Sequence, residues 1–248
     1  MKKNKSKVAI ITGASRGIGK AIALKLNKEG FVVVLVSRSQ KNLKSALKGF
    51  SKRAVAIPTD VSKEKDIISM VKKIIYKFGR VDVLINNAGW SSRKKIGQIS
   101  KEDLERVIGT NLAGTFYCTR ECLKQMEKQP EGGQIINISS IAAKIPSFFP
   151  LRSLHCATKA AIGSFAVNIQ KEMDMDKKNI KIATIYPGSV FSEWAAKRRI
   201  NPKEFKKHAL NAEDVAYVVW MIINQGKNSN ITEVTIPSIV DMTGINNF

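Results

Sequence analysis

Short apolar runs recur along the chain and alternate with longer segments in which apolar residues follow helical spacing. The apolar runs are continuous, a pattern typical of strands that are buried on both faces of a parallel sheet. The expected strands are Val8–Ile11, Val32–Val36, Ala54–Ile57, Val83–Ile85, Gln134–Ile138, Ile180–Ile185 and Thr232–Ile236. The expected helices cover about 17–29, 40–50, 63–78, 100–128, 155–175 and 212–225.

This regular alternation of strands and helices predicts an α/β fold. Specifically, we expect a doubly wound, Rossmann-type parallel sheet of about seven strands with helices on both faces. No repeat or linker separates a second unit, so residues 1–248 are expected to form a single domain. The segment 189–210 is largely polar, basic and weakly periodic, and we expect it to cover the substrate as a loop.

The composition is that of a soluble globular protein, with 44% hydrophobic and 25% charged residues. No apolar run reaches the roughly 18 residues that span a bilayer, and no signal peptide pattern follows the basic N-terminus. These features predict a cytoplasmic protein without a membrane partner. The three cysteines lack the spacing of a metal site, so no metal is expected.

The chain is strongly basic, since 42 basic and 20 acidic residues leave a net charge of +22. Such a field attracts anions without specificity. The lysines are scattered over nearly every expected helix, and no stacking platform or groove-reading element accompanies them. The pattern therefore does not favour a nucleic-acid partner.

A glycine-rich turn, residues 12–19, directly follows the first expected strand and opens into a helix. Gly13 permits a tight turn, Gly17 lets a pyrophosphate approach the backbone, and Gly19 lets the helix pack close to the sheet. The N–H groups at the start of the helix are suited to bind the anion. In this position the motif predicts a dinucleotide site.

The residues at the end of the second expected strand indicate which dinucleotide binds. An acidic residue there would bind the ribose 2′-hydroxyl and repel a 2′-phosphate. This chain has Ser37 and Arg38 instead, and Arg16 of the glycine loop adds a second cation. Two guanidiniums suit a 2′-phosphate through charge-assisted hydrogen bonds. The sequence therefore predicts NADP(H). The alternative is that Arg38 only begins a solvent-exposed helix and binds no ligand.

Further motifs follow the glycine loop, namely Asn86-Asn87-Ala88-Gly89, Asn111, Ser139-Ser140, Lys159 and Pro187-Gly188. With that loop they resemble the short-chain dehydrogenase/reductase family over nearly the whole chain. The resemblance implies cofactor contacts from Gly13, Ser15, Arg16, Gly17, Ile18, Gly19, Ser37, Arg38, Asp60, Val61, Asn87, Ala88, Gly89, Lys159, Pro187, Gly188, Val190 and Ser192. It implies catalytic roles for Asn111, Ser140, His155 and Lys159.

The chain departs from the family at the residue four positions before Lys159, where the family has its proton-transferring tyrosine and this chain has His155. Ser140 and His155 are also 15 residues apart, about two more than is usual in the family. An imidazole titrates near pH 6.5, and the cationic neighbours should lower its pKa and keep it neutral. Its shorter reach could need a bridging water. Tyr186 is an alternative proton donor, although a core role suits its position better.

Two functions remain open at this point. The first is an NADP(H)-dependent oxidoreductase that interconverts a small carbonyl compound and an alcohol. The second is an NADP(H)-binding pseudoenzyme that serves as a sensor or assembly partner. The aromatic residues expected in the substrate pocket are Trp90, Phe148, Phe149, Phe191 and Trp194. By resemblance, the chain is expected to form a homodimer or homotetramer through the helices at about 100–128 and 155–175.

Overall fold

The computed structural model describes residues 6–148, 150–191 and 202–239. Their strands form one seven-stranded sheet in the order β3-β2-β1-β4-β5-β6-β7, and every neighbouring pair is parallel. The strands are β1 Val8–Thr12, β2 Val32–Ser37, β3 Ala54–Pro58, β4 Val83–Asn86, β5 Gly133–Ile138, β6 Ile180–Pro187 and β7 Glu233–Ile236. The predicted doubly wound parallel sheet is confirmed.

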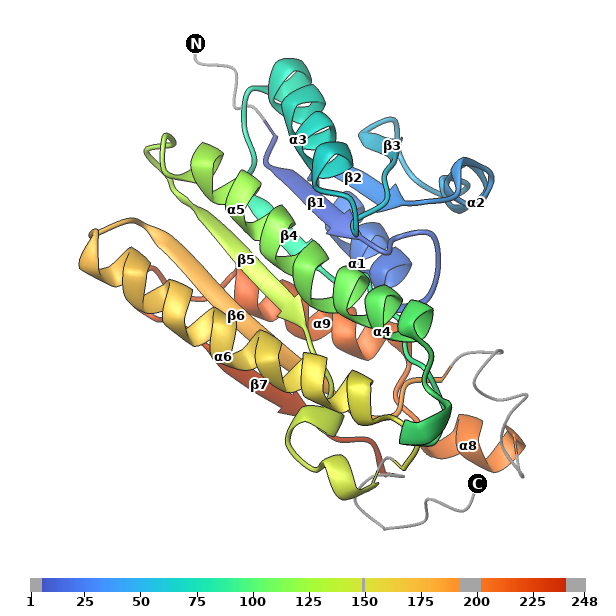
Figure 1. Ribbon diagram of the computed structural model, residues 1–248. Helices are drawn as coiled ribbons and strands as arrows, with labels where there is room; N and C mark the ends of the chain where they lie inside the picture. The colour runs from blue at the N-terminus through green and yellow to red at the C-terminus, as the bar shows by residue number, and fades with distance from the viewer. Residues whose placement is uncertain (1–5, 149, 192–201, 240–248) are drawn as a thin grey trace.

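Helices cover both faces of this sheet, as Figure 1 shows with α3, α5 and α6 in front and α1 and α9 behind. The helices are α1 Gly17–Lys28, α2 Gln40–Ala46, α3 Glu64–Phe78, α4 Lys101–Ile108, α5 Gly114–Met126, α6 Ser153–Met175, α8 Pro202–His208 and α9 Ala212–Ile223. Short 3-10 turns occupy Ile96–Gln98, Ile141–Ala143 and Pro146–Phe148.

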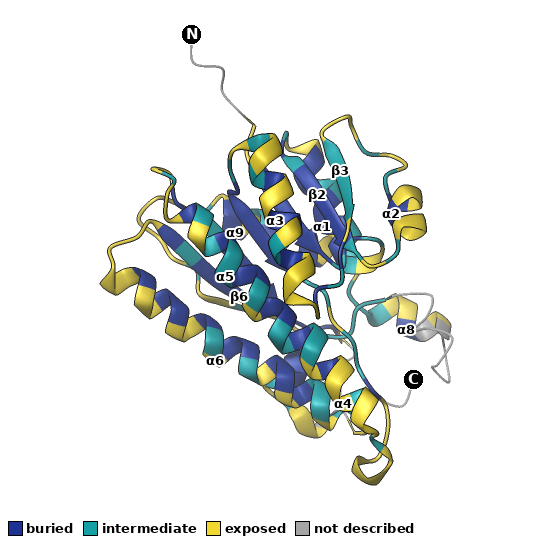
Figure 2. Ribbon diagram, turned by 45° about the horizontal axis from the view of Figure 1, so that its top comes forward, coloured by how far each residue is buried: buried dark blue, intermediate teal, exposed yellow. Residues whose placement is uncertain are grey.

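Two apolar cores result from this layering. Ile11 of β1 packs into the core beneath α1 and α9, whereas its neighbour Ile10 packs into the core beneath α3, α5 and α6. Successive strand residues point to opposite faces, so a strand with a helix layer on each side must be apolar throughout. The dark blue central strands in Figure 2 show this burial. The edge strands β3 and β7 are only partly buried.

The expected helix 100–128 is interrupted in its middle. Ser100 caps α4 in a capping box with Asp103, but a π-helical turn at Gly109–Ala113 separates α4 from α5. The Thr115 hydroxyl donates to the Asn111 carbonyl at 2.7 Å, so a side chain takes part in the backbone hydrogen bonding there. Such turns often mark functional sites because they change the direction in which a side chain points.

The segment predicted as a covering loop contains a helix. Residues 202–208 form α8, whose Phe205 side chain is 1% exposed, and Leu210 then pairs with Val190. The helix was not predicted because its buried face is narrow and the segment is otherwise polar and basic. Phe149, Ser192 and Trp194 lie outside the described residues. No helix in the described ranges is long and apolar enough to cross a membrane.

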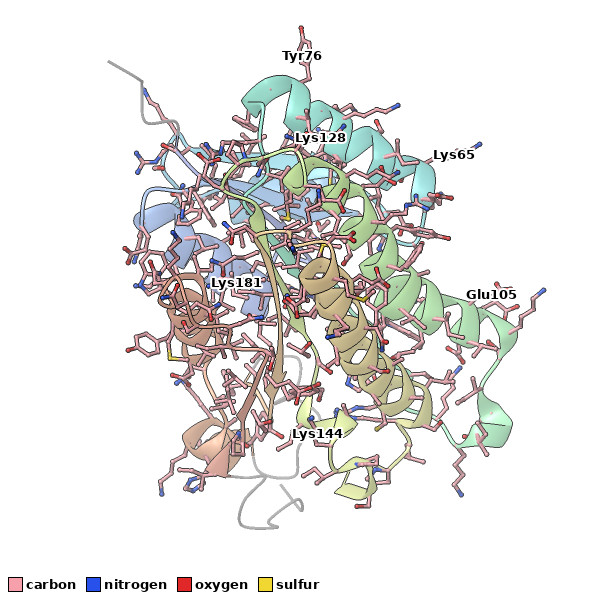
Figure 3. The ribbon with its side chains drawn as sticks, turned by 90° about the vertical axis from the view of Figure 1, so that its left-hand side faces the viewer. Lys65, Tyr76, Glu105, Lys128, Lys144 and Lys181 are labelled. Carbon is pink, nitrogen blue, oxygen red and sulfur yellow. The ribbon has the colours of Figure 1, made fainter. Side chains whose placement is uncertain are left out.

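The basic residues are distributed over many elements. Figure 3 labels Lys65 on α3, Lys128 after α5, Lys144 after a 3-10 turn and Lys181 on β6, and these side chains lie on separate parts of the surface. The structure thus agrees with the sequence expectation of scattered charge.

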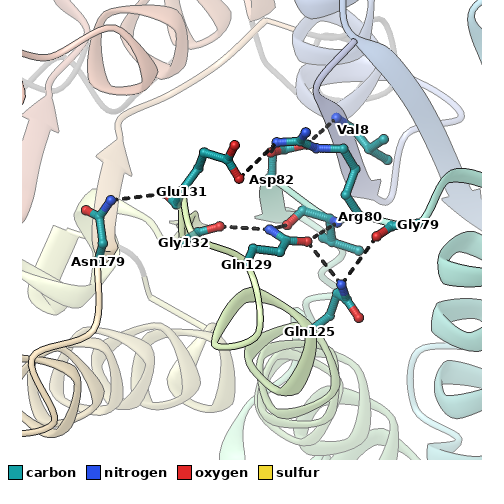
Figure 4. Close-up of polar contacts among 10 residues, drawn as sticks. Val8, Gly79, Arg80, Asp82, Gln125, Gln129, Glu131, Gly132 and Asn179 are labelled. Atoms are coloured by element: carbon teal, nitrogen blue, oxygen red, sulfur yellow. Dashed lines mark hydrogen bonds and ion pairs between the residues drawn. The ribbon is translucent and has the colours of Figure 1, made fainter. Parts of the chain in front are cut away.

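A polar network joins the starts of the strands, at the end of the sheet opposite the glycine loop (Figure 4). The buried Asp82 carboxylate accepts a hydrogen bond from Val8 N at 2.7 Å and another from Arg80 Nε at 2.8 Å. The Gln129 side chain accepts a hydrogen bond from Val81 N and donates one to Val81 O, each at 2.8 Å. These bonds satisfy backbone groups that the sheet leaves unpaired.

We expect Asp82→Ala to lower the free energy of unfolding by about 2–4 kcal/mol, because it leaves the Val8 N–H and the Arg80 guanidinium without their partner. Glu29→Gln is the matched control. It breaks the exposed Lys25–Glu29 pair, and such pairs contribute less than about 1 kcal/mol. Urea unfolding of both variants checks this prediction, and equal losses would contradict it.

Candidate functional site

The carboxyl ends of β1 and β4 mark the point where the strand order reverses, since the chain proceeds from β1 to β3 on one side and from β4 to β7 on the other. Doubly wound sheets bind their ligands in the crevice at this point. The glycine loop follows β1, and the Asn87-Ala88-Gly89 segment follows β4. The fold therefore brings these two predicted cofactor segments together.

The Thr12 hydroxyl holds the two segments in contact. It accepts hydrogen bonds from the backbone N–H groups of Asn87 and Ala88, each at 2.9 Å. The Asn87 side chain returns a bond to the Thr12 carbonyl at 2.9 Å. A Cβ atom on Gly19 would lie 2.5 Å from Asn87 Nδ2, so only glycine allows this approach. The glycine loop is thus fixed from two sides.

The start of α1 is open to an anion. Gly17 has a φ of 54° and a Cβ there would meet nothing within 4 Å, so its backbone borders free space. No side chain caps the helix, and its first turn holds no acidic residue. Ser15 and Ile18 are half-buried beside it, whereas Arg16 is exposed. Unsatisfied N–H groups with the positive end of the helix dipole bind phosphate.

The end of β2 carries the residues that were predicted to select the cofactor. Ser37 Oγ is buried and has no hydrogen-bond partner among the described residues. Arg38 follows it and is exposed, and neither Arg16 nor Arg38 forms an ion pair with another described residue. An orphaned hydroxyl followed in the chain by an exposed arginine fits an anionic ligand group.

The Asp60–Val61 pair lies in the loop between β3 and α3. The Asp60 carboxylate accepts bonds from the backbone N of Ser62 at 3.1 Å and from its hydroxyl at 2.7 Å. The Val61 side chain is buried. Helix α5 approaches this loop so closely at Gly114 that an added Cβ atom there would lie 2.9 Å from the Val61 carbonyl oxygen. These contacts fix the loop, and the Asp60 carboxylate is already partnered within the chain.

Asn111 is fully buried in the π-helical turn. Its side chain forms a pair of bonds with the Trp90 backbone, accepting from Trp90 N at 2.8 Å and donating to Trp90 O at 3.0 Å. It also donates to Thr158 Oγ1 at 3.0 Å. One amide group therefore links the segment after β4 to the helix that carries His155 and Lys159.

Lys159 holds its ammonium group in the interior. Its Nζ donates to the Ile138 carbonyl at 2.6 Å. The backbone of Gly89 is also near, since a Cβ atom added to this glycine would lie 3.7 Å from Nζ. The Ser139 hydroxyl donates to the Lys159 carbonyl at 2.7 Å and fixes α6 against β5. Burial lowers the pKa of Lys159 to about 8, because the charged form loses its hydration.

His155 is the third residue of α6 and is half-buried. Burial, together with the charges of Lys159 and Arg152, lowers the pKa of His155 to about 3, while a hydrogen bond with the Trp90 backbone acts in the opposite direction. The ring is therefore neutral at pH 7, in the direction expected from the sequence. Its Nδ1 atom is buried and has no hydrogen-bond partner in the described part of the chain.

Ser140 and the Pro187–Val190 segment lie at the ends of β5 and β6. The half-buried Ser140 hydroxyl accepts from Ala142 N at 3.2 Å and starts the following 3-10 turn. Gly188 N donates to Ile236 O at 2.8 Å, which joins the segment to β7.

Tyr186 has a structural position in the core. Its hydroxyl donates to Glu233 Oε1 at 2.7 Å, and burial together with this bond raises its pKa well above the usual range. Lys144 also binds Glu233, at 2.8 Å, so the carboxylate is shared between them. A phenol with a raised pKa whose proton is already donated to Glu233 is a poor proton source for a substrate.

Two polar residues near the site were missed in the sequence. The Thr158 hydroxyl receives the Asn111 bond and donates to the backbone at Leu154 or His155. Ser92 is 5% exposed, and its hydroxyl has no partner among the described residues. Thr158 could have been noticed as a polar residue on an otherwise buried helix face. Nothing in its local pattern distinguishes Ser92 from a loop serine.

Comparison with known proteins agrees with this geometry. The family model described as short chain dehydrogenase matches residues 7–203. An uncharacterized oxidoreductase of Staphylococcus epidermidis is 34% identical over 236 residues, which cover 95% of this chain and 99% of that protein.

Solved structures are similar over most of their length. The 3-ketoacyl-(acyl-carrier-protein) reductase of Brucella melitensis, complexed with NADH, has a TM-score of 0.85 and 25% identity and covers 94% of this chain and 97% of its own. An alcohol dehydrogenase of the archaeon Thermococcus sibiricus, complexed with 5-hydroxy-NADP, has a TM-score of 0.80 and 27% identity, with the same coverage of 94% and 97%. On these grounds the chain belongs to the short chain dehydrogenase family.

Proposed function

We propose that this protein is an NADP(H)-dependent oxidoreductase that interconverts a small carbonyl compound and an alcohol. The single observation that carries the proposal is the joint placement of an open glycine loop, a buried lysine and a buried imidazole nitrogen without a partner at one end of the sheet. The family supplies the reaction type. Residues 1–248 act as one domain, with 189–210 covering the substrate.

The residues present fit a nicotinamide dinucleotide. The free space at Gly17 and the uncapped start of α1 suit a pyrophosphate, and Ser37, Arg38 and Arg16 suit a 2′-phosphate. Related structures contain NADP-type cofactors or NADH, so the 2′-phosphate preference depends on this chain's own residues. When bound, the cofactor supplies or accepts the hydride.

The chain's own residues then handle the proton. His155 is neutral near pH 7, and since its ring is also bonded to the Trp90 backbone, the unpartnered Nδ1 is a hydrogen-bond acceptor. It accepts the hydrogen bond of the alcohol hydroxyl and takes its proton as the alcohol is oxidised, and it returns this proton to the oxygen in the reverse direction, in place of the family's tyrosine. Lys159, with a pKa of about 8, is still mostly protonated at pH 7 and acts as the nearby proton store. Ser140 provides a hydroxyl group at this end of the sheet.

The second candidate function is an NADP(H)-binding pseudoenzyme. One observation favours it: an imidazole with a pKa of about 3 is almost never protonated at pH 7 and is a weak base. Such a protein would keep the nucleotide site and lose turnover. Activity measurements on variants of His155 separate the two candidates.

We also propose that the chain forms a homodimer or homotetramer. The helices expected to form the interface carry apolar side chains that are between 40% and 56% exposed. They are Leu104 and Ile108 of α4, Phe116 of α5 and Val167 of α6. Apolar side chains gathered on neighbouring helices favour contact with a second copy.

For the cofactor, we expect NADPH to bind at least about tenfold more tightly than NADH, since charge-assisted bonds to a 2′-phosphate exceed about 1.4 kcal/mol in sum. Arg38→Gln should reduce this preference. Lys48→Gln, which removes an exposed lysine after α2, should leave it unchanged. Fluorescence titration with both nucleotides checks this, and equal affinities in the wild type would exclude the proposed role of Arg38.

For catalysis, we expect His155→Ala to reduce carbonyl reduction about 10²-fold or more, with NADPH affinity little changed. In the wild type, reduction should decline as the pH rises through about 8, because Lys159 loses its proton there. Unchanged activity in His155→Ala would overturn the role of His155. A wild type that binds NADPH but is silent on all substrates, with activity gained in His155→Tyr, would identify the pseudoenzyme.

For assembly, sedimentation at micromolar concentration should show a dimer or tetramer, and Phe116→Asp with Val167→Asp should shift it toward the monomer by placing charges on the apolar surface. The exposed Tyr76→Asp on α3 is the control and should not change the assembly state. A wild-type monomer would contradict the proposal.

A further inference from the structure

Strand β3 forms one edge of the sheet, and its only neighbouring strand is β2 (Figure 1). The Arg53 carbonyl accepts a hydrogen bond from Val33 N at 3.0 Å, so the backbone groups of Arg53 point toward β2. In a parallel pair these groups alternate in direction from one residue to the next, and the register of β3 with β2 is regular. The N–H and carbonyl groups of Ala56 therefore point away from the sheet, where no described strand pairs with them.

A groove of about 380 Å³ runs along this free edge. It is lined by Leu43 and Lys44 of α2, by Val55 and Ala56 of β3, and by Lys77 of α3. Helices α2 and α3 lie on opposite sides of the sheet edge, so the groove has a wall on each side of β3 and an apolar floor (Figure 1). Its shape suits an extended chain that lies alongside the strand.

The surface around this groove is basic. Residues 39–59 contain no aspartate or glutamate, and their five basic residues are exposed and form no ion pair with another described residue. They are Lys41, Lys44, Lys48, Lys52 and Arg53. Elsewhere on the surface acidic residues are interspersed and pair with cations, as in Lys25–Glu29 and Lys94–Asp103. The edge of β3 is therefore a region of uncompensated positive charge.

These charges select among the chains that could pair with a free strand. Lysines at a sheet edge disfavour pairing with a basic strand, and a second copy of β3 would bring the same five cations with it. A nucleic acid would meet the charges but has no peptide groups with which to continue the hydrogen-bonding pattern of the sheet. An acidic, extended polypeptide satisfies both the charges and the backbone.

We propose that the free edge of β3 is a docking site for an acidic, extended segment of a partner protein. The segment adds a strand to the sheet by pairing with the backbone of Ala56, and its carboxylates contact Lys44 and Lys77 on the two walls of the groove. This surface lies on α2, β3 and α3, away from His155 and Lys159, so the inference does not depend on the proposed oxidoreductase function.

The probe is a synthetic seven-residue peptide, acetyl-Glu-Glu-Val-Ile-Val-Glu-Glu-amide, with a fluorescent label. One control peptide carries N-methyl groups on its three apolar residues, which removes the N–H donors needed for strand pairing. A second control has lysine in place of every glutamate. In fluorescence anisotropy at 0.15 M salt, the acidic peptide should bind at least tenfold more tightly than either control. Equal binding of the N-methylated peptide would overturn the proposal, because attraction to charge alone would then explain it.

Hydrogen exchange measured by NMR locates the contact. The Ala56 amide should exchange rapidly in the free protein, because it has no strand partner, and at least tenfold more slowly when the acidic peptide is bound. An Ala56 amide that is already protected in the free protein, or that is unchanged by saturating peptide, would overturn the proposal. So would a twelve-residue oligodeoxythymidine that displaces the peptide and protects Ala56 equally well, since it would assign the surface to nucleic acid.

Variants separate the groove from the overall field of the protein. Lys44→Glu combined with Lys77→Glu should weaken binding of the acidic peptide at least tenfold. Lys65→Glu combined with Lys128→Glu is the matched control, because it changes the net charge equally at two exposed lysines outside the groove (Figure 3). Equal losses in the two double variants would overturn the proposal. If a variant fails to fold, the N-methylated peptide still decides the question, since that comparison uses the unaltered protein.

Discussion

The burial of the Lys159 ammonium is the constraint on which the site depends. In the described part of the chain no carboxylate pairs with it, and its visible partner is the Ile138 carbonyl. Burial lowers the pKa of this ammonium group toward neutrality, and its charge disfavours a second cation nearby. His155 is held neutral first by its own burial and then by the charges of Lys159 and Arg152.

A buried charge needs a rigid surrounding, and three side chains provide it. Thr12 joins the glycine loop to the segment after β4, Asn111 joins that segment to α6, and Ser139 joins α6 to β5. Each bond connects elements far apart in sequence, so the three predicted motifs form one unit. The π-helical turn is what allows Asn111 to bond both Trp90 and Thr158. Preorganisation of this kind spares the site from rearranging when ligands bind.

The sequence predicted much of this architecture, since apolar runs covered by helices on both sides have a pattern that few folds share. The sequence placed all seven strands and the glycine loop. Burial on two faces requires consecutive apolar residues, such as Ile10 and Ile11, which pack into opposite cores. It missed the π-helical turn and α8. The turn places Asn111 against Trp90 and Thr158, and α8 buries Phe205. Such contacts arise only in the folded chain. For the same reason the roles of Thr158 and Ser92 were not visible in the local pattern.

The central claim is that a buried, positively charged surrounding keeps His155 neutral. Its most direct test is an NMR titration of the imidazole resonances of the two histidines, with His155→Asn used for assignment. The structure predicts that His155 remains neutral down to about pH 4, consistent with a pKa of about 3, and that Lys159→Met raises this pKa. A His155 pKa near the ordinary 6.5, unchanged in Lys159→Met, would contradict the account.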